Sequence, residues 1–164
     1  MSVFISYRHT DIDIALQIDK KLKSADIITY LDRLDPESQT TDDITSVITK
    51  KIAQCSHLIA IISTQTASSW WVPFEIGEAT ILERRITSYQ TGCNSLPEYL
   101  DKWPIMKNIQ HLELFIDAYN NDTNPIPATE RAGMESIGGV FGNSNRAEKF
   151  HQELKEKISF EKHL

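Results

Sequence analysis

Short apolar runs recur along this chain, and longer polar segments separate them. The runs are VFIS at 3–6, IITYL at 27–31, HLIAIIS at 57–63, RITSY at 85–89 and HLELFI at 111–116. Strands that alternate with helix-length segments are typical of βα units, because parallel strands need long crossover connections. The sequence therefore predicts an α/β fold, with an open five-stranded parallel sheet covered by helices on both faces.

Apolar residues repeat at helical spacing in three of the segments between and after these runs. In order along the chain they are Ile14, Ala15, Ile18 and Leu22, then Ile44, Val47, Ile48 and Ile52, and finally Ala147, Phe150, Leu154 and Ile158. The first two sets predict helices that cover the sheet, and the third predicts a closing helix at about 146–160.

The length of 164 residues, 40% of them hydrophobic, suits one domain with a substantial core. We expect a single domain over 1–164, with its core at 2–117. The segment at about 118–145 is rich in Asn, Gly, Pro and Ser and has no clear periodicity, which predicts a long loop.

Charge and cysteine content narrow the partners and the compartment. A net charge of −6 with no basic stripe argues against binding to nucleic acid or to an anionic membrane surface. The two cysteines, Cys55 and Cys93, have no metal-ligand spacing, which favours a reducing compartment over a disulfide framework. No apolar run approaches the roughly 18 residues of a membrane span. We expect a soluble, cytoplasmic protein with no metal.

Several common site motifs are missing from the sequence. The five histidines show no HxxxH or HxH spacing, which disfavours a zinc site. There is no GxGxxG after the first strand, no GxxxxGK[ST] and no GxSxG. Dinucleotide-fold oxidoreductases, P-loop enzymes and serine hydrolases are therefore disfavoured.

The first strand runs into SYRHTD at 6–11. Ligands of open α/β sheets bind at the carboxyl ends of the strands, so Arg8 and His9 are candidates to meet a ligand, and Thr10 or Asp11 is a candidate helix cap. Alternatively, Arg8 is an ordinary solvated surface charge. After the second strand, Asp42 or Asp43 is placed to cap the next helix.

The third strand is followed by SSWWVPFEIGEA at 68–79. Ser68 or Ser69 can cap a helix whose first turn accepts Pro73, so the helix is predicted to begin at about Trp70. Trp71 and Glu75 then lie on the same side, one turn apart. Two readings stay open for this pair: a stacking platform beside a catalytic carboxylate, or core packing beside an acid that only balances the helix dipole.

Four of these blocks, VFISYRHTD, YLDRLDPES, HLIAIIST and SSWWVPFEIGEA, resemble the Toll/interleukin-1 receptor (TIR) domain in order and spacing. The likeness runs over about residues 2–90, with looser support from LPEYLDKWP and the closing helix. The Trp-x-x-x-Glu spacing and the length are similar to those of stand-alone bacterial TIR proteins that break down NAD+, including the signal-generating members of Thoeris antiphage systems. The resemblance implies a flavodoxin-like sheet of strand order 2-1-3-4-5.

The resemblance also implies the residues of the site. Glu75 matches the catalytic glutamate, and the family's BB loop falls at 33–42. Substrate contacts are implied for six positions: Ser6, Tyr7, Arg8, Asp32, Leu34 and Trp71. Trp70 stands where the family commonly has a small or polar residue, and we expect it to contribute more to packing than to the site. NAD+ is then a substrate and no cofactor is implied. The implied partners are further copies of the chain, in head-to-tail contact, and a separate effector that senses the product.

Such a site needs few groups, because nicotinamide in NAD+ is already a cationic leaving group. One carboxylate can hold the ribose and stabilise an oxocarbenium-like centre, and capture of that centre within the same molecule gives a cyclic ADP-ribose isomer. The main alternative is a non-catalytic TIR scaffold, which needs no acid at position 75. A second is a nucleoside deoxyribosyltransferase-like enzyme with Glu75 as covalent nucleophile. A response-regulator receiver is disfavoured, because IIST occupies the end of the third strand where an aspartate is needed.

Overall fold

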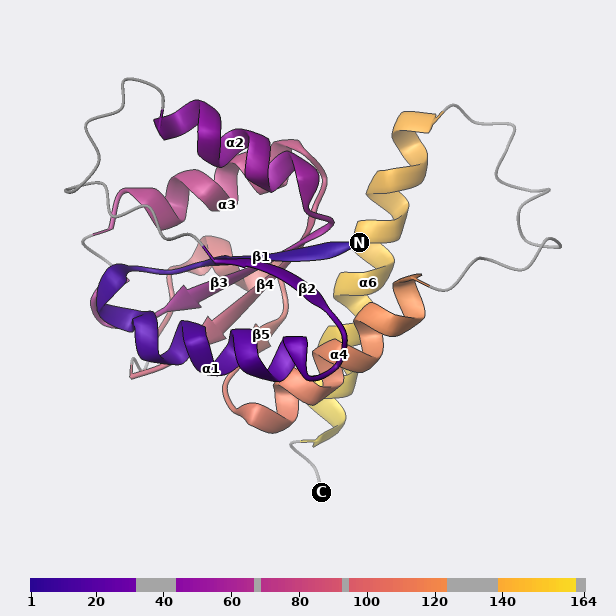
Figure 1. The fold of residues 1–164 in the computed structure, drawn as a ribbon. Coiled ribbons are helices and arrows are strands. Elements are labelled where there is room, and N and C mark those ends of the chain that lie inside the picture. Colours follow the sequence, from indigo (N-terminus) through magenta and orange to yellow (C-terminus); the bar gives the residue numbers. More distant parts are fainter. Residues whose placement is uncertain (32–43, 67–68, 93–94, 124–138, 162–164) are drawn as a thin grey trace, which may run out of the picture.

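The computed structural model describes residues 1–31, 44–66, 69–92, 95–123 and 139–161. Its strands form one parallel sheet (Figure 1): β1 (Ser2–Ser6), β2 (Ile28–Leu31), β3 (His57–Ile62), β4 (Arg85–Gln90) and β5 (Ile105–Met106). The strand order is β2-β1-β3-β4-β5, which confirms the predicted topology. Since neighbouring strands are all parallel, their carboxyl ends meet at one edge of the sheet.

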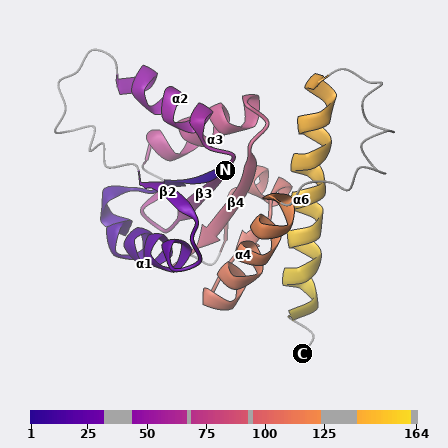
Figure 2. The same ribbon diagram turned by 45° about the vertical axis from the view of Figure 1, so that its right-hand side comes forward.

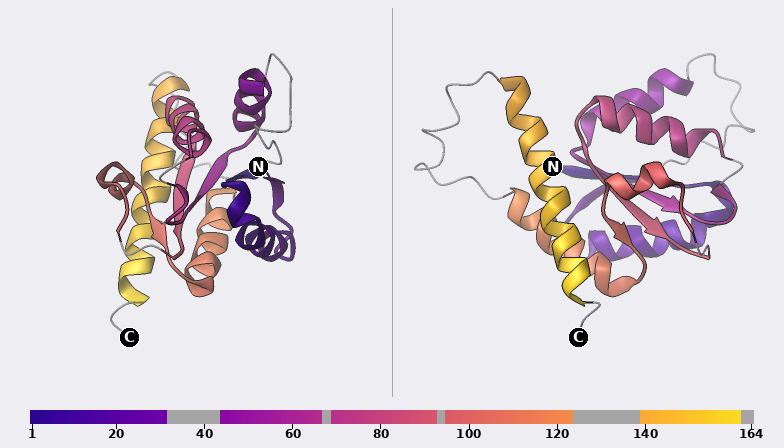
Figure 3. Two further views of the ribbon diagram at one scale, coloured as in Figure 1. Left: turned by 90° about the vertical axis from the view of Figure 1, so that its left-hand side faces the viewer. Right: turned by 180° about the vertical axis from the view of Figure 1, so that it is seen from behind.

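Helices cover both faces of the sheet (Figures 1 and 3). The helix α2 (Ile44–Gln54) and the helix α3 (Trp71–Ile81) lie on one face. The opposite face carries α1 (Ile12–Lys23), which follows the 3-10 helix η1 (His9–Asp11), and α4 (Ile109–Thr123). The closing helix α6 (Gly139–Glu161) packs beside α4 (Figure 2), and the 3-10 helix η3 (Glu98–Lys102) precedes β5.

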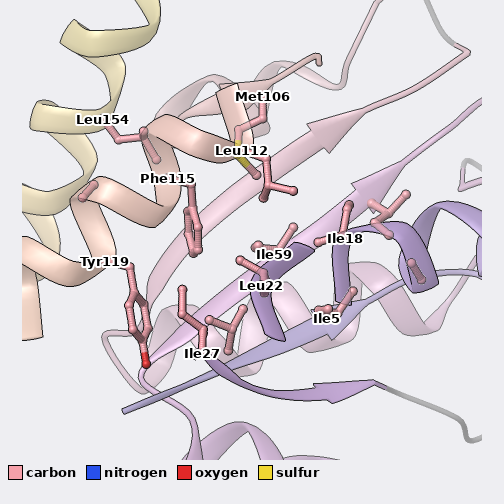
Figure 4. Close-up of a cluster of buried hydrophobic side chains, with 14 of the residues drawn as sticks. Ile5, Ile18, Leu22, Ile27, Ile59, Met106, Leu112, Phe115, Tyr119 and Leu154 are labelled. Carbon is pink, nitrogen blue, oxygen red and sulfur yellow. The ribbon is translucent and has the colours of Figure 1, made fainter. Parts of the chain in front are cut away.

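The core is divided by the sheet because successive strand residues point to opposite faces. In β1, Ile5 packs with the cluster under α1, α4 and α6, whereas Phe4 packs with the cluster under α2 and α3. Figure 4 shows the first cluster, where Ile59 of β3 lies among residues from α1 and α4. Both faces are thus apolar, as the continuous apolar run of β3 predicts for a buried parallel strand.

The predicted helical faces are largely confirmed. The residues of the predicted faces that are buried are Ala15, Ile18, Leu22, Ile48, Ile52, Ala147, Phe150, Leu154 and Ile158. Ile14 and Ile44 are only partly buried, and Val47 remains 43% exposed on α2. The apolar stripe of α2 is therefore narrower than the sequence pattern indicated.

The prediction of a fifth strand at 111–116 was wrong. This run lies inside α4, and β5 is the two-residue strand Ile105–Met106. Leu112 and Phe115 are both buried and stand three residues apart, which is helical spacing. Asn108, immediately before the helix, accepts a hydrogen bond from the His111 N–H at 2.8 Å and so caps the first turn.

The bounds of the predicted loop at 118–145 also need correction. The helix α4 continues through Thr123, and α6 begins at Gly139, ahead of the predicted start at about 146. Residues 124–138 lie outside the described residues.

A polar cluster, here called the amino-end cluster, lies where β3 and β4 begin, and consists of His57, Arg85, Asp122 and His151. Arg85 Nε is 3.0 Å from Asp122 Oδ2, which ties β4 to α4. His151 Nε2 accepts a hydrogen bond of 2.8 Å from the Ile86 N–H, so α6 completes the edge of β4 that the short β5 leaves unpaired. Burial lowers the pKa of His57 well below its usual value and, with nearby cations, lowers the pKa of His151 to about 4.

Candidate functional site

Glu75 and Ser6 meet at the carboxyl end of β1. Ser6 ends this strand and lies two residues after Phe4, so it faces the α2 and α3 side. Its hydroxyl donates a hydrogen bond to the Glu75 Oε2 of α3, and both residues are 0% exposed. Ala60 stands beside Ser6 in the β1–β3 register, and these small residues let a helix-borne carboxylate approach the sheet. The structure thus brings together two residues that the sequence placed in one site.

The start of α3 sets the height of Glu75 above the sheet. The helix begins at Trp71, one residue after the predicted start. The Ser69 hydroxyl accepts a hydrogen bond of 3.3 Å from the Val72 N–H, so Ser69 serves as the side-chain acceptor for the first turn, and Ser68 lies outside the described residues. Pro73 fits this turn because its missing N–H would have no partner within the helix.

Trp71 lies one turn before Glu75 on the same side of α3. Its ring is half-buried against the α2 and α3 cluster and meets the Phe74 ring edge-on, with the centroids 5.8 Å apart. Trp71 therefore packs against the core and is still partly accessible.

Trp70 behaves differently from its neighbour. Its side chain is 90% exposed, so the prediction that it contributes to packing was wrong. The physical reason is its position before the first helical turn, where the chain has not yet turned toward the sheet.

The residues that follow Ser6 divide between different environments. Tyr7 is only 8% exposed and belongs to the cluster under α1, α4 and α6, because the next residue along a strand direction turns to the other face. It therefore lies on the opposite face of the sheet from Ser6. Arg8 is half-buried, and its Nη1 donates a hydrogen bond of 2.5 Å to the Gln65 carbonyl, while His9 is exposed. Arg8 links the connection after β1 to the connection after β3.

Asp11 was expected as a possible helix cap, but its side chain makes no capping hydrogen bond to α1. Its Oδ2 instead accepts a hydrogen bond of 2.9 Å from the Ser63 hydroxyl, at the end of β3. Sequence reasoning missed this contact. The available signal was the adjacency of the first and third strands, which places the connections after them side by side.

Other expected site residues lie outside the described residues: Asp32, Leu34, the loop 33–42, and the candidate caps Asp42 and Asp43. Within the described ranges, no three His, Cys, Asp or Glu residues gather as a metal site would require. None of the helices in the described part of the chain combines the length and the apolar character needed to cross a membrane.

The geometry supports a definite chemistry at Glu75. The Ser6 hydroxyl, by donating to the Glu75 carboxylate, holds it in one orientation. An oriented carboxylate in surroundings of low polarity stabilises positive charge more strongly than one in water. The site is therefore suited to a reaction that develops a cation beside Glu75.

Two of the solved structures compared with this chain agree with its fold. The TIR domain of the Toll-related receptor TRR-2 from Hydra magnipapillata superposes with a TM-score of 0.52 at 17% identity, covering 63% of this chain and 81% of the other. A 2-deoxyribosyltransferase from Bacillus psychrosaccharolyticus gives 0.54 at 10% identity, covering 79% and 95%. The TIR domains of the activated Roq1 resistosome give 0.48 at 14% identity, covering 94% and 81%. No curated protein matches the chain.

The structural likenesses are all below 25% identity and concern the fold alone, so the sequence decides the family. The family model described as the TIR domain matches residues 3–125, which is most of the chain and includes Ser6, Trp71 and Glu75. This chain belongs to the TIR domain family.

Proposed function

We propose that this chain is an NAD+-cleaving TIR enzyme with Glu75 as its catalytic carboxylate. The observation that carries the proposal is the fully buried Glu75, which the Ser6 hydroxyl holds at the carboxyl edge of the sheet, one turn after a half-buried tryptophan. This is the edge at which open α/β sheets bind ligands. A scaffold has no need to bury an acid at this position, because an unneeded buried carboxylate only lowers stability.

In the proposed reaction, the bond between ribose C1′ and the nicotinamide nitrogen breaks, and its electron pair stays on nicotinamide, which leaves neutral. Glu75 stabilises the positive charge that develops on the ribose and accepts hydrogen bonds from the ribose hydroxyls. The cation then bonds either to water, which loses a proton, or to a nucleophilic atom of the same molecule. The second route yields a cyclic ADP-ribose isomer.

We further propose that the cyclic product is a signal in antiphage defence of the Thoeris type, read by a separate effector. The accessible part of Trp71 supports this route, since an aromatic platform beside the carboxylate can fold the dinucleotide so that its ends meet. Glu75 is fully covered, so substrate has to displace part of that cover. Head-to-tail contact with another copy is the proposed means.

The test is to incubate the purified chain with NAD+ over a range of protein concentrations and resolve the products by mass spectrometry. A cyclic isomer supports the full proposal, and linear ADP-ribose supports cleavage alone. Absence of turnover at every concentration, with binding to another TIR protein, indicates the scaffold. A glycosyl adduct trapped on Glu75 indicates the covalent chemistry of a deoxyribosyltransferase-like enzyme.

A further inference from the structure

The connections that follow β1 and β3 are joined by side chains at the edge where Glu75 lies. Building on the proposed NAD+ cleavage, we propose that Asp11 and Ser63 are positioning residues. Their hydrogen bond fixes the β3–α3 connection, so that α3 begins at the point that delivers Glu75 to Ser6.

The two connections are neighbours because β1 and β3 pair directly, with Ser6 opposite Ala60. Their strands end at the same edge of the sheet, next to the first turn of α3 (Figure 1). The Ser63 hydroxyl donates to Asp11 Oδ2 at 2.9 Å and accepts from the Gln65 N–H at 3.1 Å. The Ser63 hydroxyl thus joins Asp11, after β1, to the backbone of Gln65, after β3. Because it donates one hydrogen bond and accepts another, its orientation is fixed.

From Ser63 the hydrogen bonds continue to α3. The Ser63 N–H donates to Thr66 Oγ1 at 2.9 Å, and the Thr66 carbonyl accepts from the Ser69 N–H at 2.8 Å. The Ser69 hydroxyl then accepts from the Val72 N–H in the first turn of the helix. Thr66 is only 7% exposed, so the middle of this path is shielded from competing water.

A second tie runs in parallel with the first. Arg8 donates to the Gln65 carbonyl at 2.5 Å, and the Asp11 N–H donates to the Arg8 carbonyl at 2.8 Å within η1. Arg8 and Asp11 therefore lie at a fixed spacing on one short helical turn. Arg8 binds Gln65 and Asp11 binds Ser63, both in the connection after β3. This arrangement constrains the direction of the β3–α3 connection as well as its distance from β1.

The proposed reaction is sensitive to small displacements of the Glu75 carboxylate. Glu75 has to present its carboxylate to a ribose within a fraction of an ångström, and a shift of about 1 Å can lower a rate by about 100-fold. Loss of the Asp11–Ser63 bond loosens the base from which α3 starts. The effect is expected on kcat, whereas ground-state binding of NAD+, measured as KM, changes little.

The test compares Asp11→Ala, Ser63→Ala and the rescue variant Ser63→Thr, which keeps the hydroxyl. The matched control is Thr29→Val, because Thr29 donates to the Asp19 carboxylate through the same kind of bond between β2 and α1, away from α3. Ser63→Ala and Asp11→Ala are expected to lower kcat by about 10- to 100-fold, and the double variant to be no worse than either single variant. Ser63→Thr and Thr29→Val should retain kcat close to that of the unaltered chain.

Hydrogen exchange of the backbone amides in the first turns of α3 provides a readout independent of turnover. Faster exchange is expected in Asp11→Ala and Ser63→Ala and not in Thr29→Val. The inference is overturned if exchange there is unchanged, if kcat stays intact, or if Thr29→Val lowers kcat equally. If the unaltered chain fails to cleave NAD+, the proposed function fails, and exchange alone then decides whether this pair positions α3.

Discussion

The hydrogen bond from the Ile86 N–H to His151 makes the stability of this fold depend on pH. His151 accepts the proton of that bond on Nε2, which requires a neutral ring. Burial, followed by the charges of Lys155, Arg85 and Lys102, lowers its pKa to about 4, against about 6.5 in an unfolded chain. A histidine whose pKa is lowered by folding contributes stability above the unfolded pKa and loses it as the pH falls toward the folded pKa.

The size of the effect follows from the two pKa values. Between pH 6.5 and pH 5 the unfolded chain takes up a proton at this position and the folded chain does not, which costs about 1.36 kcal/mol per pH unit, or about 2 kcal/mol. His151→Gln provides the comparison, because its amide oxygen can still accept from Ile86 N–H but does not titrate. His57, whose pKa is also lowered, is present in both proteins. Burial is the largest cause of its shift and is shared by both, although His151 also contributes to it.

Urea unfolding of both proteins at pH 7 and pH 5 measures the difference. The free energy of unfolding should fall by about 2 kcal/mol more in the unaltered chain than in His151→Gln. Equal losses in the two proteins would refute the reasoning, because they would show that His151 takes up its proton as readily when folded as when unfolded.

The remaining predictions concern the reaction. Glu75→Gln should keep the circular-dichroism spectrum, since the amide oxygen can accept from Ser6, yet lower NAD+ cleavage by about 10³-fold; normal turnover would remove Glu75 from its role. Specific activity should rise with protein concentration, and a flat dilution series from a protein that stays monomeric in scattering would count against assembly. At matched conversion, Trp71→Ala should shift the products toward linear ADP-ribose, whereas Trp70→Ala should not, because that side chain is 90% exposed; the opposite result would exchange their roles.

Much of the sheet was predictable because each of the first four strands is a short apolar run between turn signals. The fifth strand was misplaced because the short, mostly apolar run at 111–116 fits a strand about as well as one side of a helix. The burial of Leu112 and Phe115, three residues apart, decides for the helix, and the Asn108 cap was the signal in the sequence that pointed the same way.

Local patterns predicted the site less completely than the sheet. The pairing of Ser6 with Glu75 follows from strand alternation once the helix is known to lie on the Phe4 side, and the same alternation turns Tyr7 to the opposite face. The bond between Asp11 and Ser63 does not follow in this way. Strand order shows that the connections after β1 and β3 are neighbours, but the side-chain rotamers that join them depend on the tertiary structure. For this reason Asp11, which looks like a helix cap in the sequence, instead binds the connection after β3.

Different interactions hold the amino and carboxyl ends of the sheet. Changes that affect the stability of the amino end can therefore leave the proposed site at the carboxyl end unaltered. At the amino end, the Arg85–Asp122 ion pair and the bond to His151 tie β4 to α4 and α6 with groups that are largely buried. At the carboxyl end, the connections around Glu75 are tied by the half-buried side chains of Arg8, Asp11 and Ser63 and by the exposed Gln65. Thr66 is the buried exception. Buried ion pairs are costly to break, whereas exposed ties exchange readily with water. A change in pH that loosens α6 at the amino end therefore need not alter the geometry at Glu75.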